Sequence, residues 1–181
     1  MRKIFYPVSL FSLSVLWSTL AVAKEAPNHA MVTSRDVPSE CDQVVDNLVS
    51  NCGFETSAFD FWIRSGDLGD TFVTSNPDQI HSGGFACETG PAGDLGFLKQ
   101  TLPTTAGQSY TLTFWLKNSE RPNHFQLFWD GAVIFDATDM PNFPYTQMVF
   151  EDLVASADGT DLQFGFYNLD FYFHLDDVVV H

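Results

Sequence analysis

Two acidic motifs could bind a metal ion, and they lie far apart in the sequence. Residues 51–55 read NCGFE, and residues 175–178 read LDDV. Each motif places carboxylates next to apolar residues in a segment typical of a β-strand, where an unpaired buried charge would be costly. A hard cation such as Ca²⁺ would offset that cost, because carboxylate and carbonyl oxygens are its preferred ligands. We therefore predict that the first and last strands meet around one structural calcium ion.

The patterns of common catalytic sites are missing from the sequence. The five histidines show no metal-ligand spacing. There is no Gly-x-Ser-x-Gly elbow, phosphate-binding loop or dinucleotide fingerprint. Carboxylates are plentiful, but the sequence does not fix a pair at the separation that glycoside hydrolysis requires. The protein is therefore predicted to be a binding module and not an enzyme.

The N-terminus has the features of a secretory signal peptide. Two basic residues precede an apolar stretch at residues 4–20, and residues 21–23 (AVA) have the small side chains that a signal peptidase needs. Cleavage after Ala23 would give a secreted or periplasmic protein. Residues 24–43 are polar and lack a periodic apolar pattern, which predicts a flexible leader before a single domain at 44–181.

The net charge restricts the class of partner. Eight basic and 23 acidic residues give the full chain a formal charge of −15. Loss of residues 1–23 would remove two of the eight basic residues and make the charge more negative. Such a surface repels phosphate backbones and anionic lipid headgroups. No second apolar run is long enough to cross a bilayer. These features exclude nucleic acid and membrane insertion, and they leave divalent cations and neutral ligands such as sugars.

Three cysteines, Cys41, Cys52 and Cys87, follow the predicted cleavage site. Disulfides persist in exported proteins, and an odd number leaves one cysteine unpaired. A bond between Cys41 and Cys52 would join the leader to the first strand, whereas a bond between Cys52 and Cys87 would join two segments near the predicted metal site. The first pairing is favoured, and the second stays open.

The distribution of apolar residues predicts an all-β protein. Residues 110–116 and 162–166 alternate between apolar and polar or small side chains, as expected for strands with one buried face. Turn formers separate the candidate strands, and no segment has helical periodicity. The pattern predicts an antiparallel β-sandwich. Its strands are expected at residues 44–49, 53–55, 61–65, 71–74, 84–88, 96–101, 109–118, 124–129, 132–135, 146–153, 161–167 and 171–180.

Six segments together resemble a known family. In order along the chain, they are similar to conserved segments of galactose-binding-domain-like jelly rolls. The similarity is close to carbohydrate-binding modules of families 4, 9 and 22, and to exported bacterial proteins with a related domain. Cys52 stands where that family usually has glycine. The segments are residues 47–55, 59–62, 81–86, 98–102, 110–116 and 175–178.

The resemblance implies a ligand set for the calcium ion. It assigns a side-chain oxygen to Glu55, a backbone carbonyl to Gly83 and a side-chain oxygen to Asp176. Asp177 is the alternate carboxylate, and Asn51 could add a carbonyl. These oxygen ligands suit Ca²⁺, and a glycine permits the turn that would point its carbonyl inward.

A sugar-binding module also needs exposed aromatic side chains, because a pyranose presents an apolar C–H face and a rim of hydroxyl groups. The candidates are Trp115, Trp129, Tyr145 and Tyr172. They predict a neutral polysaccharide or glycan as the partner. The alternative is a cell-surface or matrix interaction protein that uses the same fold without binding sugar, since one fold hosts many functions.

Overall fold

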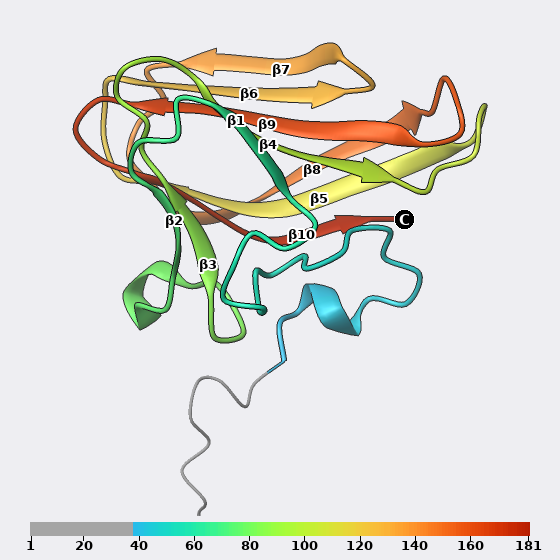
Figure 1. The fold of residues 1–181 in the computed structure, drawn as a ribbon, viewed down its shortest axis with the longest axis horizontal. Coiled ribbons are helices and arrows are strands. Elements are labelled where there is room, and N and C mark those ends of the chain that lie inside the picture. The colour runs from blue at the N-terminus through green and yellow to red at the C-terminus, as the bar shows by residue number, and fades with distance from the viewer. Residues whose placement is uncertain (1–37) are drawn as a thin grey trace, which may run out of the picture. The chain divides into compact units, whose positions relative to one another are not determined.

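The computed structural model describes residues 38–181, and the predicted signal peptide lies outside them. Ten antiparallel strands form two sheets of five, which confirms the predicted β-sandwich (Figure 1). The first sheet has the order β1-β4-β9-β6-β7 and the second has the order β2-β3-β10-β5-β8. The strands of the first sheet are β1 (Ile63–Gly66), β4 (Gly96–Leu102), β9 (Thr160–Asn168), β6 (Asn123–Trp129) and β7 (Ala132–Thr138). Those of the second sheet are β2 (Thr71–Thr74), β3 (Ala86–Thr89), β10 (Phe173–Val180), β5 (Ser109–Asn118) and β8 (Phe143–Val154).

The alternation seen in the sequence separates the core from the surface. In β6, every second residue from Asn123 to Trp129 is buried, and β5 shows the same pattern from Leu112 to Asn118. Aromatic rings fill the space between the sheets. Phe164 is fully buried, and its ring lies 5.1 Å from Phe114 and 6.1 Å from Trp62, measured between ring centroids. The two sheets are therefore held together by rings from both layers.

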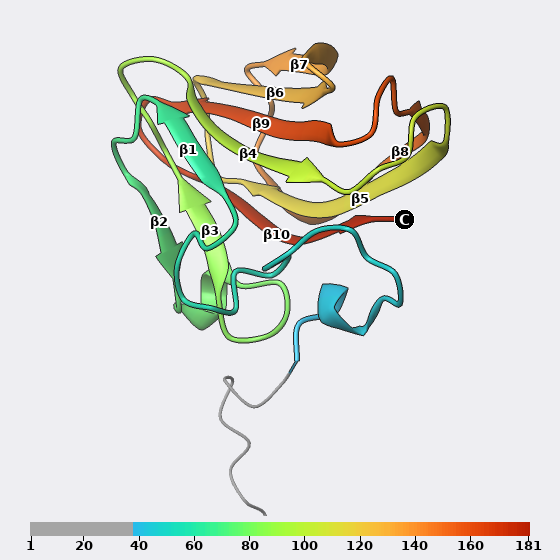
Figure 2. The ribbon, with the colours of Figure 1, turned by 45° about the vertical axis from the view of Figure 1, so that its right-hand side comes forward.

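The segment before β1 differs from the prediction. Strands were expected at residues 44–49 and 53–55, but this part of the chain is a series of turns. The reason is local backbone geometry, because five non-glycine residues between 46 and 61 have φ between 51° and 69°. The segment still runs along β10 (Figure 2), where Leu48 N–H donates to Val180 O and Val178 N–H donates to Cys52 O.

The end of the predicted leader is packed against the sandwich. Ser39 is fully buried and Cys41 is 1% exposed. Cys41 begins a short 3₁₀ helix, η2 (Cys41–Gln43). The part of the leader from Ser39 onward therefore belongs to the folded domain and not to a flexible tail. Among residues 38–181, there is no helix long and apolar enough to span a membrane.

Candidate functional site

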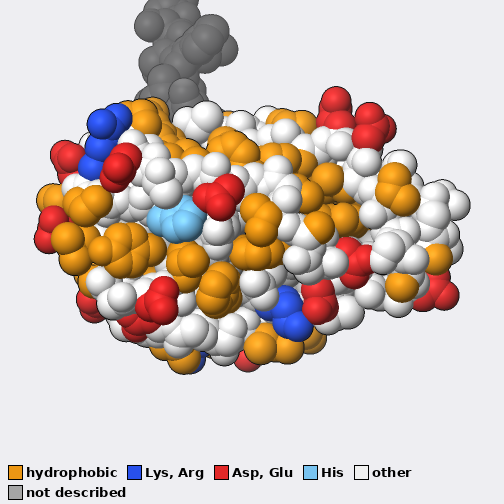
Figure 3. Space-filling view, turned by 90° about the horizontal axis from the view of Figure 1, so that it is seen from above, with side chains coloured by type: hydrophobic (Ala, Val, Ile, Leu, Met, Phe, Trp, Pro, Cys, Tyr) orange, Lys and Arg blue, Asp and Glu red, His pale blue; other side chains and the backbone are white. Residues whose placement is uncertain are grey.

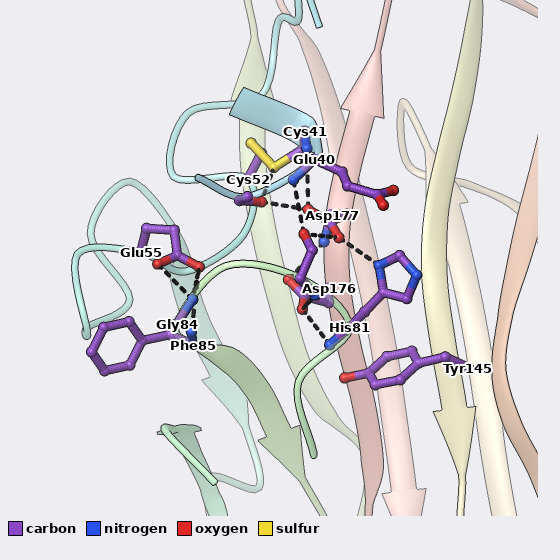
Figure 4. Close-up of polar contacts among 12 residues, drawn as sticks. Glu40, Cys41, Cys52, Glu55, His81, Gly84, Phe85, Tyr145, Asp176 and Asp177 are labelled. Atoms are coloured by element: carbon purple, nitrogen blue, oxygen red, sulfur yellow. Dashed lines mark hydrogen bonds and ion pairs between the residues drawn. A yellow bond between two sulfur atoms is a disulfide. The ribbon is translucent and has the colours of Figure 1, made fainter. Parts of the chain in front are cut away.

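The side-chain carboxylate of Asp177, on β10, makes hydrogen bonds to several segments of the chain (Figure 4). Its side chain is 2% exposed, and its Oδ1 accepts from Ser39 Oγ and, at 3.1 Å, from Cys41 N. Its Oδ2 lies 2.7 Å from His81 Nδ1 and accepts from Ser82 Oγ at 2.6 Å. These contacts join three chain segments, namely the N-terminal segment, the loop between β2 and β3, and the last strand.

The neighbouring carboxylate, Asp176, is fully buried and has a different set of partners. Its Oδ2 accepts from the backbone N–H groups of His81 at 2.9 Å and Ser82 at 3.3 Å, and its Oδ1 accepts from Asp177 N at 2.8 Å. The pKa of the Asp176 carboxyl is raised to about 9, first by burial and second by the nearby charge of Asp177. The three backbone N–H groups lower this pKa but do not offset the effect of burial.

Glu55 reaches the same loop from the opposite side. Its Oε1 accepts from Gly84 N at 3.0 Å and from Phe85 N at 3.3 Å. Burial, as the largest cause, raises the pKa of Glu55. Gly83 has φ +68°, and a β-carbon placed on it would lie only 2.1 Å from Glu55 Oε1. The position therefore requires glycine, both for its backbone conformation and for the close approach of the carboxylate.

The structure thus brings Glu55, Gly83 and Asp176 to one turn, residues 81–85. Asn51 lies apart from this arrangement. Its backbone carbonyl already accepts from Trp62 Nε1 and from Phe54 N, both at 3.2 Å. Its side chain is bonded to Ala58, Asp60 and Thr56 in the turns before β1. Asn51 therefore has a structural role in those turns, and its backbone carbonyl already accepts two hydrogen bonds.

Within the described residues, two clusters place possible metal-ligand atoms within 4.8 Å of one another. One consists of Glu40, His81 and Asp177. The other contains Asp42 with Cys41 and Cys52, whose sulfur atoms are joined to each other in a disulfide. Glu55 and Asp176 belong to neither cluster. Asp176 is next to Asp177 on β10, and Glu55 lies at the other end of the 81–85 turn (Figure 4). This region of the described chain is the candidate metal centre.

The disulfide joins Cys41 to Cys52, with an S–S distance of 2.02 Å, and this confirms the favoured pairing. Cys87 is the free cysteine and is fully buried. Both half-cystines lie beside the acidic strand, because Cys41 N–H donates to Asp177 and Cys52 O accepts from Val178 N. The disulfide therefore fixes the N-terminal segment over the candidate metal centre.

We expect the double variant Cys41→Ser/Cys52→Ser to lose about 2–3 kcal/mol of unfolding free energy, because the bond closes a short loop in the unfolded chain. Urea denaturation of the oxidised wild type and the variant measures this difference. A dithiol reductant should lower the wild-type midpoint and leave that of the variant unchanged. Equal midpoints for the oxidised wild type and the variant would contradict the expectation.

Two of the predicted sugar platforms, Trp115 and Tyr145, lie on the outward face of the second sheet under the β2–β3 loop. His81 from that loop stacks on Trp115, with ring centroids 3.9 Å apart. Tyr145 Oη donates to Gln79 O at 2.8 Å. Lys117, on the same face, donates to Asp78 O at 2.8 Å. The loop therefore covers one face of Trp115 and much of Tyr145.

Trp115 also lines a pocket of ≈ 330 Å³ with Glu40, Cys41, Val44, Thr113, Gln147, Asp177, Val179 and His181.

The other two predicted platforms have different surroundings. Trp129 is 4% exposed, and its indole N–H donates to Val154 O at 3.0 Å. It therefore packs in the core, which corrects its prediction as an exposed stacking surface. Tyr172 is half-buried directly before β10, and its ring packs edge-to-face on Phe72 at 6.0 Å.

The outward face of the first sheet carries aromatic and amide side chains that the sequence did not single out as a group. Strand pairing aligns Lys99, Gln163 and Phe128 in one row across β4, β9 and β6. The next row contains Phe97, Gly165 and Gln126, and the third contains Tyr167 and His124. Phe97 and Phe128 pack edge-to-face at 6.1 Å. We call this surface, comprising Phe97, Lys99, Gln126, Phe128, Gln163 and Tyr167, the aromatic face.

The charged groups on and around the aromatic face are paired. Lys99 Nζ lies 2.9 Å from Asp161 Oδ2. His124 Nε2 lies 2.7 Å from one oxygen of Asp136, and Gln126 donates to the other at 3.0 Å. Figure 3 views the side that carries β6 and β7, where hydrophobic side chains (orange) are mixed with a few charged groups and one histidine (pale blue). A pocket of ≈ 190 Å³ on this surface is lined by Lys99, Phe128, Gly131, Asp161 and Gln163.

Comparisons with solved structures identify the fold. No protein-family model and no curated protein sequence matches the chain. TmCBM61, solved in complex with β-1,4-galactotriose, superposes with a TM-score of 0.63 at 18% identity, covering 75% of this chain and 97% of that one.

The chain is also similar to two other solved structures whose names state a binding role. The CBM22-1 xylan-binding domain of Paenibacillus barcinonensis Xyn10C has a TM-score of 0.53 at 12% identity and covers 75% of this chain and 94% of that one. The K3 adhesin domain of Lys-gingipain from Porphyromonas gingivalis has a TM-score of 0.54 at 17% identity and covers 73% and 96%. The chain therefore has the jelly-roll fold of carbohydrate-binding modules.

Proposed function

We propose that this protein is a secreted, non-catalytic carbohydrate-binding protein that binds a neutral glycan on the aromatic face. The observation that carries the proposal is the composition of that face. It combines three partly exposed aromatic rings with the amides of Gln126 and Gln163, on a rigid sheet. Aromatic rings suit the apolar face of a pyranose, and amides suit its hydroxyl rim.

The pairing of charges supports a neutral ligand. The only lysine of the aromatic face, Lys99, is bonded to Asp161 and is not free to attract a carboxylate or sulfate. The formal charge of the whole chain, −15, also opposes binding of polyanions. Affinity for a neutral sugar then depends on stacking and hydrogen bonding, and we expect it to be modest.

We also propose that Glu55, Gly83 and Asp176 hold a structural calcium ion, with Asp177 positioning the surrounding segments. The buried Asp176 carboxylate and the Glu55 carboxylate at the same turn support this assignment. A bound Ca²⁺ would add a positive charge beside these two groups. The three residues lie before β1, in the β2–β3 loop and on β10, so the ion would stabilise the fold and would not contact a sugar on the aromatic face.

The retention of variants on insoluble polysaccharides tests the proposed face. Tyr167→Ala removes an aromatic ring from the aromatic face, while Tyr172→Ala removes one from the second sheet, where the sequence predicted a platform. We expect Tyr167→Ala to be retained at least about tenfold less well than the wild type, and Tyr172→Ala to behave as the wild type does.

The outcomes separate the candidate sites. Loss of retention in Tyr172→Ala alone would place the ligand at the edge of the second sheet. If the wild type is retained on no polysaccharide, the proposed function is wrong, and an interaction protein of the same fold becomes the better account. Release of reducing sugar by the wild type would contradict the non-catalytic assignment.

A further inference from the structure

The position of the Phe97 ring is set by two glycines on the neighbouring strands. Phe97 lies on β4, between β1 and β9, and pairs with Ser65 and Gly165. A β-carbon placed on Gly165 would lie 3.0 Å from Cε1 and 3.2 Å from Cδ1 of Phe97. A β-carbon placed on Gly66 would lie 2.9 Å from Cδ2 and 3.2 Å from Cε2. The two long edges of one ring thus rest on two glycines, one on each side.

This contact pattern defines the position of the ring. Because its opposite edges approach Gly66 on β1 and Gly165 on β9, the ring is held between these two strands. Side chains at Gly66 or Gly165 would meet the ring closer than real β-carbons normally approach. Phe97 is nevertheless partly exposed, and Phe128 contacts it edge-to-face. The ring is therefore held in place and is partly open to solvent on the aromatic face.

We propose that Phe97 is the principal stacking platform for a neutral pyranoside, and that Gly66 and Gly165 are positioning residues that fix where its ring lies. This inference rests on the proposed function and names the side chain that would stack on the sugar. An aromatic ring can cover the unsubstituted C–H face of a pyranose. Gln126 lies in the same row of the sheet, and its side-chain carbonyl can accept from a sugar hydroxyl while its Nε2 donates to Asp136. A ring displaced from its position between the glycines would lose part of the stacking contact.

Gly165 is the better glycine for a test. Gly66 has φ +73°, and its added β-carbon would lie 2.3 Å from the carbonyl oxygen of Leu95, so a substitution there would strain the backbone. At Gly165, the nearest atoms are the Phe97 ring and, at 3.3 Å, Cβ of Gln126, which are all side-chain atoms. Gly165→Ala should therefore lift the ring without disrupting the strand.

The experiment measures dissociation constants for β-1,4-galactotriose and xylohexaose, together with melting temperatures. Phe97→Ala, Phe97→Leu and Gly165→Ala are each expected to weaken binding at least about tenfold. Phe97→Tyr keeps a flat ring and should bind within about threefold of the wild type, a tolerance below the tenfold loss that truncation should cause. Phe72→Ala is the matched control, because Phe72 is 43% exposed on an outer strand of the second sheet. It should bind as the wild type does.

Each outcome has a defined meaning. If the wild type binds but Phe97→Ala binds equally well, Phe97 is not the platform, while the proposed function stands. If Phe97→Ala loses binding and Gly165→Ala does not, the positioning role of the glycine is wrong. If Phe97→Leu binds as well as Phe97→Tyr, the contact is general apolar burial and not stacking. Failure of the wild type to bind either sugar or a wider glycan array would overturn the platform together with the proposed function.

Discussion

Calcium is expected to raise the melting temperature of the wild-type protein, and a chelator is expected to lower it. The buried Asp176 carboxylate and Glu55 face one turn of the chain, and an ion bound only by the folded state stabilises that state by mass action. At a calcium concentration 100 times the dissociation constant, the gain is about 2.7 kcal/mol. Differential scanning calorimetry with calcium and with EGTA measures the shift. Asp176→Asn should abolish it.

A matched control separates loss of the ion from loss of a carboxylate. Asp67, in the loop between β1 and β2, also accepts hydrogen bonds from three backbone N–H groups, those of Gly69, Gly93 and Asp94. It lies outside the candidate metal centre, so Asp67→Asn should keep the full calcium-dependent shift. An identical melting curve with calcium and with EGTA for the wild type would show that Glu55, Gly83 and Asp176 do not bind the ion.

The calcium-free protein is expected to lose stability as the pH rises from about 7 to 9. At lower pH, His174 acts in the opposite direction, because burial lowers its pKa to about 4 and the unfolded chain takes up a proton that the folded protein does not. The pKa of Asp176 is raised from 3.8 to about 9 in the folded state, mainly by burial. Over this interval the folded protein keeps a proton that the unfolded chain has released, so unfolding becomes easier at higher pH. Burial raises the pKa of Glu55 as well, which acts in the same direction. The pKa values of Asp136 and Asp161 are lowered by hydrogen bonds, so these groups titrate below the interval.

Calcium should reverse this trend, because it binds the charged carboxylate. Its stabilising effect should therefore be small at pH 5 and should grow by several kcal/mol toward pH 9, an order-of-magnitude expectation from linkage. Urea denaturation at pH 5, 7 and 8.5, with calcium and with EGTA, measures both trends. A calcium effect that is constant over this range would contradict the assignment of Asp176 as a ligand.

The sequence predicts most strands of the sandwich because many of them, such as β4, β5, β6 and β9, have one buried face. The alternation of β5 and β9 marks them directly, and the turn formers between strands fix their ends to within a few residues. The region before β1 could not be predicted in this way. Its apolar residues are spaced like those of a strand, yet positive φ values at positions such as Asp46 and Phe54 turn the chain repeatedly. Those angles are stabilised by contacts with β10, which lies more than 100 residues away.

Local sequence patterns predict the residues of the candidate sites less completely than they predict the strands. The resemblance assigned Glu55, Gly83 and Asp176 to one site, and the structure places all three at one turn. The stacking residues are harder to predict. The alternation of apolar and polar residues indicates on which face of the sheet a side chain lies, but not which other segments cover that face. Trp115 points outward and is still covered by His81. The sequence does not single out Phe97, because the glycines that flank its ring, Gly66 and Gly165, come from two other strands.

Mapping the sugar-binding surface by nuclear magnetic resonance tests most directly whether the aromatic face binds a glycan. A ¹⁵N-labelled sample of the mature protein is titrated with xylohexaose and with β-1,4-galactotriose, in the presence of calcium. We predict that the largest amide shifts will cluster on β4, β9 and β6, around Gly165 and Gln126, with little change near Trp115 on β5. Shifts confined to the second sheet, or saturation with no shift on the first sheet, would contradict a glycan site on the aromatic face.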